Sequence, residues 1–149
     1  MTALAIFAGL FWSAFLAATI LPGASELVLI AALAETAVDP VTAVLIAGTG
    51  NTLGSIVNWA MGRYFARYAD RKWFPVPKPA LEKAEMVFRR YGSWTLLFAW
   101  WPFGGDALTL AAGFLRIPLL TFTVLVAAGK FARYAVIAAA TLGVENCIL

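Results

Sequence analysis

Two carboxylates stand inside otherwise apolar stretches of this sequence, at matching places in two similar motifs. The stretch ILPGASELVLIAA at residues 20–32 carries Glu26, and WWPFGGDALTLAA at residues 100–112 carries Asp106. Both stretches match the pattern P-x-x-x-[E/D]-x-x-x-x-A-A. Ionisable groups at membrane depth mark ion or substrate pathways, and desolvation favours the protonated form of an acid. The motif therefore predicts two acids that take up and release a proton.

Helix-breaking residues precede each acid. A break frees backbone N–H and C=O groups, which a membrane tolerates only where protein or water covers them. We therefore expect re-entrant turns, with segments 3–34 and 94–115 each folded as two half-helices of about ten residues or more. In the alternative interpretation, each acid only caps the half-helix that follows it. The predicted breaks are at Pro22, Gly23, Pro102, Gly104 and Gly105.

The expected partners of these acids are three cations inside or at the edge of the second half, Arg116, Lys130 and Arg133. Lys130 and Arg133 lie three residues apart and share a helical face within residues 118–143. A cationic pair beside a protonatable acid suits an anionic lipid headgroup, and a guanidinium group suits phosphate in particular. In the alternative interpretation, both side chains extend toward the membrane interface.

Four further polar residues complete the candidate site. Arg63 and Arg116 stand at the ends of apolar segments, where they contact headgroups or act as plain cytoplasmic anchors. Asn51 and Asn58 are expected to line a polar cavity between the spanning segments.

The composition places these residues in a membrane protein. The chain of 149 residues is 62% hydrophobic and 13% charged, with mean hydropathy +0.85, whereas soluble domains carry about 25% charged residues. Residues 1–25 and 40–62 contain no charged side chain, and each stretch is long enough to span a bilayer. The first lacks the basic start of a signal peptide.

Several classes of function are disfavoured. The sequence has no histidine, a single cysteine and no phosphate-binding loop of the form G-x-x-x-x-G-K-[ST]. We therefore expect no metal, no cofactor and no nucleic-acid partner. An enzyme acting on lipid phosphates would lack an activated nucleophile or a metal cluster, so the chain is predicted not to be an enzyme.

A basic connector separates the two halves of the chain. Residues 62–92 hold eight of the eleven lysines and arginines, which predicts a cytoplasmic loop. After the breaker PVPKP, residues 81, 84, 88 and 91 fall on one face of an amphipathic helix at the membrane surface. The alternative is an ordinary solvated connector.

The two halves predict an inverted repeat within one membrane domain, residues 1–149. Repeat 1 covers about residues 3–61 and repeat 2 about residues 93–143, and each contains a broken hairpin followed by a spanning helix. One spanning segment leads into the basic loop and the other leads away from it, so the repeats have opposite orientations. Inverted repeats with interrupted helices are typical of transporters, whose site lies near the midplane. The fold class is thus an all-α integral membrane protein.

Four motifs in order resemble those of the DedA family, also called the SNARE-associated or VTT-domain family, and in particular its small YqaA-like branch. They are LPGASE (21–26), GNTLGSIVNWAMGR (50–63), RYGSWTLLFAWWPFGGD (90–106) and AAGFLRIPLLTF (111–122). The resemblance implies two facing re-entrant hairpins and a role in moving or scrambling lipids. For bacterial members it implies recycling of undecaprenyl phosphate or flipping of phospholipids, with proton coupling.

The resemblance also assigns individual positions. Glu26 matches the acid of the first hairpin, and Arg63 matches the arginine that ends the glycine-rich segment. In the second hairpin, Ala99 stands where typical members carry an arginine, and Gly105–Asp106 stands at a second arginine position. Trp59 replaces the usual tyrosine. Lys130 and Arg133 supply the missing positive charge, or the substrate differs.

These observations predict a lipid flippase or scramblase that moves an anionic lipid with protons in a bacterial inner membrane. The central basic loop of this multi-pass protein is expected in the cytoplasm, and a homodimer is left open as the transporting species. The alternatives are a proton-coupled antiporter of small solutes or ions, and a membrane assembly subunit without transport.

Overall fold

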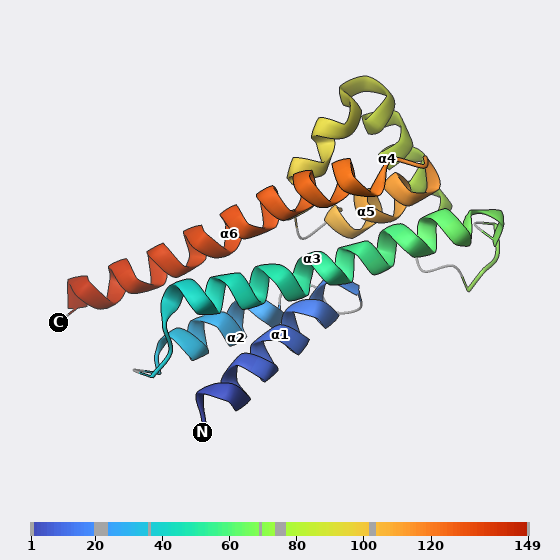
Figure 1. The fold of residues 1–149 in the computed structure, drawn as a ribbon. Coiled ribbons are helices and arrows are strands. Elements are labelled where there is room, and N and C mark those ends of the chain that lie inside the picture. The colour runs from blue at the N-terminus through green and yellow to red at the C-terminus, as the bar shows by residue number, and fades with distance from the viewer. Residues whose placement is uncertain are drawn as a thin grey trace. The chain divides into compact units, whose positions relative to one another are not determined.

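The computed structural model describes residues 2–19, 24–35, 37–68, 70–73, 77–101 and 104–148, with side chains up to residue 144. This described part of the chain is helical and contains no strand, so the all-α prediction is confirmed (Figure 1). In chain order the elements are α1 (Ala3–Thr19), α2 (Ala24–Leu33), α3 (Pro40–Tyr64), η1 (Ala66–Tyr68), α4 (Lys78–Tyr91), η2 (Gly92–Phe98), α5 (Gly105–Phe114) and α6 (Leu119–Ile148).

Among the described residues, two helices are long and apolar enough to cross a membrane. They are α3, with 25 residues, and the part of α6 from Leu119 to Val144, with 26 residues. At 1.5 Å per residue each extends for about 37 Å or more, beyond the roughly 30 Å hydrocarbon core of a bilayer. By contrast, α1 has 17 residues and α2 has ten, fewer than the roughly 20 that a crossing needs. The re-entrant hairpin stays a prediction, because residues 20–23 between these helices, including Pro22 and Gly23, lie outside the described residues.

The start of α3 is defined by an acidic cap. The Asp39 carboxylate accepts hydrogen bonds from the backbone N–H of Thr42 at 2.8 Å and from its hydroxyl at 2.7 Å. Pro40 occupies the first helical position, where its missing N–H costs nothing. The two Thr42 hydrogen bonds hold the pKa of Asp39 below its ordinary value of 3.8.

We expect Asp39→Ala to lower the melting temperature of the protein in micelles, because the cap is lost. Since the folded-state pKa is depressed, the stabilisation is complete above the ordinary pKa and disappears as the pH falls through the lowered value. The difference in melting temperature between wild type and Asp39→Ala should therefore be constant at neutral pH and vanish in strong acid. Asp39→Ser should keep much of the cap. A difference that persists below pH 2 would contradict this assignment.

The chain forms two compact units, the first comprising residues 1–54 and 130–149 and the second residues 55–129. In the first unit α1 and α2 lie side by side (Figure 1). Two glycines of α3 let α1 approach closely. A Cβ atom at Gly50 would meet the carbonyl oxygen of Phe11, and one at Gly54 would meet that of Phe15. Small residues at these positions thus permit close packing of the two helices. The core also contains the buried residues Leu10, Ala14, Leu29, Ala43, Ala47 and Tyr134.

In the second unit α4, η2 and α5 pack together. The predicted amphipathic helix is present as α4, and Leu81, Ala84 and Phe88 are buried as expected. Tyr91 falls on the same face by its spacing, and its side chain is 60% exposed. Tyr91 is the last residue of α4, and Gly92 adopts φ +68° directly after it, so the chain leaves the helical path there.

The second break differs from the expected pair of half-helices. Only the half after the break is an α-helix, the ten-residue α5, while residues 92–98 form the 3₁₀ helix η2. Trp94 and Thr95 are poor helix formers, and the proline that follows Trp101 disfavours helical backbone before it. Gly104 precedes α5 and Gly105 opens it, where a Cβ atom would meet the Ala99 carbonyl. Pro102 lies outside the described residues.

Candidate functional site

An ion pair joins the first acid to a cation of the long C-terminal helix. Glu26 lies in the first turn of α2, and its carboxylate pairs with the Arg133 guanidinium of α6. The two side chains are 33% and 16% exposed, respectively, so this pair is largely withdrawn from solvent. Arg133 lies inside the α6 segment that is long enough to span a bilayer. The expected pairing of Glu26 with a base from the second half of the sequence is therefore present.

A second contact between the same helices involves two hydroxyl groups. The Ser25 and Tyr134 hydroxyls are 2.9 Å apart in a buried hydrogen bond, and the Tyr134 side chain is fully buried. The Arg133 guanidinium also lies 5.8 Å from the centre of the Tyr134 ring. Sequence reasoning missed Tyr134. A phenol directly after an arginine inside an apolar segment was the signal that could have found it.

Lys130 is buried one turn before Arg133. Its ammonium group donates a hydrogen bond to Asn51 Oδ1 on α3, and Asn51 Nδ2 donates to the Ala14 carbonyl on α1 at 2.8 Å. Lys130 is only 2% exposed, so its side chain does not extend to an interface. Asn51 thus links the cation to the backbone of α1, and three helices meet at this point.

These contacts define a polar cluster around α6, made of Ser25, Glu26, Asn51, Lys130, Arg133 and Tyr134. Two of its members are cations and one is an acid, which leaves a formal excess of one positive charge. Buried excess charge favours a ligand of opposite sign. The cluster therefore presents positively charged and hydrogen-bonding groups that suit an anion.

The other predicted polar residues lie in the second unit. Asn58 Nδ2 donates to Thr109 Oγ1 at 3.3 Å, and Thr109 Oγ1 donates to the Asp106 carbonyl at 2.8 Å. Asp106 is partly buried in the first turn of α5. The second unit has a cavity between α4, η2 and α5, and neither Asn58 nor Asp106 is among the described residues that line it. The proton-coupling role of Asp106 stays a prediction, as does the cavity-lining role of the two asparagines.

The remaining two arginines are exposed at helix ends. The Arg63 guanidinium, in the last turn of α3, lies 5.6 Å from the Trp59 ring centre and complements the negative end of the helix dipole. Arg116 follows α5 and adopts the left-handed conformation, with φ 59°. The Arg116 N–H donates to the Gly113 carbonyl and the Ile117 N–H to the Ala112 carbonyl, both at 3.0 Å, as in a Schellman motif.

Arg116 occupies a backbone position that favours glycine. We expect Arg116→Gly to raise the free energy of unfolding by about 1 kcal/mol, because a Cβ atom is unfavourable in left-handed backbone. Chemical unfolding in micelles measures this change. Arg116→Ala keeps the Cβ atom but removes the charge, and it should not stabilise the protein. Equal effects of the two substitutions would contradict the backbone explanation.

In the described residues, no group of three or more histidine, cysteine, aspartate or glutamate side chains is placed to hold a metal ion.

Comparisons with known proteins give a consistent result. The sequence profile of the VTT domain matches residues 1–142. The chain is 43% identical over 143 residues to the inner membrane protein YqaA of Escherichia coli (strain K12), which covers 94% of this chain and 93% of that protein. The same values hold for the inner membrane protein YqaA of Shigella flexneri. A protein of Haemophilus influenzae is 34% identical over 132 residues, covering 84% of this chain and 80% of that protein. No solved structure matches the chain significantly.

Proposed function

Because this chain belongs to the VTT-domain family of membrane proteins, also called the DedA family, we propose that it moves an anionic lipid across a bilayer. The resemblance inferred from four short motifs is confirmed by the match over residues 1–142. The proposed substrate is undecaprenyl phosphate or a phospholipid, and transport is coupled to protons. The printed name of the E. coli relative places that protein in the inner membrane. We propose the same location here, with several crossings and the basic connector in the cytoplasm.

One observation carries this proposal: charged side chains of one membrane-length helix are buried against two other helices. Lys130 is 2% exposed, and Arg133 is paired with Glu26. A purely structural membrane helix has no need of two cations in its central part, because ionisable groups are costly at that depth. Their retention is explained if they contact a ligand that is itself anionic.

The proposed mechanism is a competition for Arg133. While Glu26 is ionised, its carboxylate holds the guanidinium. Protonation of Glu26 removes that partner, and the guanidinium becomes available to the phosphate of a lipid, which it can bind with two parallel hydrogen bonds. Lys130 adds a second positive charge one turn away. Release of the lipid lets Glu26 lose its proton and restore the ion pair, so lipid and proton movements are linked.

The second repeat is proposed to contribute Asp106 in the same way, from a re-entrant hairpin of opposite orientation. A homodimer is proposed as the transporting unit where one chain does not enclose the whole path. No catalytic step is part of this mechanism.

The test is lipid flux in proteoliposomes, with fluorescent phosphatidylglycerol or polyprenyl phosphate, with and without a pH gradient. We expect Glu26→Gln to abolish the response to the gradient and to lower flux to about a tenth of wild type or less. The neutral amide cannot lose a proton and restore the ion pair that accompanies lipid release, and a hydrogen bond to a charged group contributes about 1.5–3 kcal/mol. Glu35→Gln is the matched control, because Glu35 is exposed in the turn before α3 and should leave flux unchanged. Wild-type flux in Glu26→Gln would refute proton coupling at Glu26.

The same experiment separates the alternatives. If wild type moves neither lipid but moves a small anion against protons, the protein is an antiporter that uses the same cluster. If wild type moves neither lipid nor a small anion, and Glu26→Gln folds as stably as wild type, the chain is an assembly subunit.

A further inference from the structure

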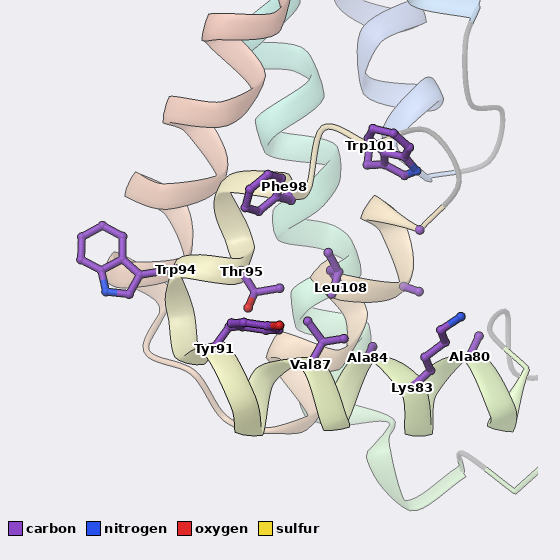
Figure 2. A pocket seen from close by; sticks show the side chains of 12 residues that line it. Ala80, Lys83, Ala84, Val87, Tyr91, Trp94, Thr95, Phe98, Trp101 and Leu108 are labelled. Carbon is purple, nitrogen blue, oxygen red and sulfur yellow. The ribbon is translucent and has the colours of Figure 1, made fainter.

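The second unit contains a cavity that the transport mechanism does not use. It has a volume of about 730 Å³ and lies between α4, η2 and α5 (Figure 2). This volume falls within the range of roughly 300–1,000 Å³ typical of ligand sites. Its described lining is mostly apolar and aromatic, with Tyr91, Trp94, Phe98 and Trp101 as its large rings.

The cavity follows one face of α4 as a groove. Its lining residues on this helix recur every three or four positions from Ala80 to Tyr91, and therefore form a continuous stripe. At 1.5 Å per residue this stripe is about 16 Å long. The groove is thus elongated and fits a chain-like ligand better than a compact one.

Lys83 and three of the four large rings lie at different ends of the groove. Lys83 is near the start of the stripe, whereas Tyr91, Trp94 and Phe98 gather at its far end (Figure 2). Lys83 is exposed, and the twelve described lining residues include no aspartate or glutamate. The described lining therefore carries one positive charge near one end, and apart from the hydroxyl groups of Tyr91 and Thr95 its other side chains are apolar.

We infer that this groove binds one acyl chain of an anionic phospholipid from the surrounding bilayer, with the phosphate headgroup beside Lys83. The polarity of the groove matches that of a lipid, whose charged head and apolar tail are likewise at opposite ends. The inference requires that the protein lies in a membrane, but it does not require transport.

The test uses photoreactive lipids in phosphatidylcholine nanodiscs that contain the full chain. Phosphatidylglycerol and phosphatidylcholine carrying the same photoreactive acyl chain are compared, and the adducts are mapped by mass spectrometry. We expect adducts on groove residues such as Val87 and Leu108, with about a fivefold preference for phosphatidylglycerol, since one basic residue near a membrane surface is worth about 1 kcal/mol. Exposed Leu4 of α1 serves as an internal reference for non-specific contact with lipid.

Lys83→Gln should abolish the headgroup preference, whereas Lys78→Gln, at the other lysine of α4, should keep it. Lys78 does not line the groove and pairs with Asp70 on the surface. Ala107→Phe should fill the groove and lower adduct formation there at least fivefold for both lipids, with no change at Leu4. If Ala107→Phe does not fold, as judged by circular dichroism, Val87→Phe fills the groove from α4 instead.

Groove labelling no stronger than at Leu4, or unchanged by the filling variants, would overturn the inference. A headgroup preference that survives Lys83→Gln would overturn the position of the headgroup. Because labelling is measured rather than flux, a protein that transports no lipid but still shows these adducts would refute the proposed function and leave this inference intact.

Discussion

Replacing Gly113 with alanine is expected to lower the free energy of unfolding by about 3 kcal/mol or more. A Cβ atom at Gly113 in α5 would meet the carbonyl oxygen of Trp59 and the backbone nitrogen of Arg63 in α3. Gly62 of α3 faces α5 in the same way, where a Cβ atom would meet the carbonyl oxygen of Leu110. Both obstacles are backbone atoms of helices, which cannot move aside as a flexible side chain can, so the two helices must separate.

Thermal or chemical unfolding in dodecylmaltoside micelles measures this loss. Gly143→Ala is the matched control, since it makes the same substitution within α6, where a Cβ atom meets nothing within 4 Å. There alanine should stabilise the helix by about 1 kcal/mol. A Gly113→Ala protein as stable as wild type would show that α3 and α5 do not approach at these glycines.

The second large effect concerns Lys130 and Asn51. Replacing Lys130 with methionine should lower lipid flux at least tenfold, because a buried positive charge for the anionic lipid is removed. Asn51→Leu alone should destabilise the protein by about 2 kcal/mol, because the buried ammonium group loses the Asn51 oxygen. In the double variant neither polar group remains, and apolar side chains of similar size are often tolerated in place of buried polar pairs.

A double-mutant cycle in micelles measures the coupling between the two residues. We expect Asn51→Leu/Lys130→Met to be about 2 kcal/mol more stable than the sum of the single changes predicts. Lys78→Met is the control for removal of a lysine charge, since Lys78 is exposed at the start of α4 and should affect neither stability nor flux. Additive single effects would contradict the contact, and wild-type flux in Lys130→Met would exclude a role in transport.

The long elements were predictable from sequence because their signals extend over many residues. Segments 41–61 and 118–143 were expected to span, and the structure forms helices α3 and α6 there. The amphipathic α4 followed from the spacing of Leu81, Ala84 and Phe88. The pairing of Glu26 with Arg133 was also predictable. Such an apolar chain has few charged groups, and an acid at membrane depth is stabilised by pairing with a cation.

Local backbone geometry was not predictable in the same way. Arg116 adopts left-handed backbone although it is not a glycine, so its residue type does not predict this turn. The 3₁₀ helix η2 begins at Gly92, directly after α4, and depends on the direction in which the chain leaves that helix. The Ser25–Tyr134 hydrogen bond joins residues 109 positions apart, and no sequence pattern relates them. The inverted repeat and its facing hairpins stay predictions, because Pro22, Gly23 and Pro102 lie outside the described residues.

The placement of Trp59 provides an optical reporter. Its indole N–H donates to the Ile117 carbonyl at 3.0 Å, and the side chain is 8% exposed, whereas Trp12, Trp73, Trp94 and Trp101 are all exposed. Indole emission shifts to longer wavelength when the ring becomes hydrated. A variant that keeps Trp59 and replaces every other tryptophan would therefore report the opening of residues 55–129 as a shift in its emission wavelength. The rest of the molecule would contribute no tryptophan emission.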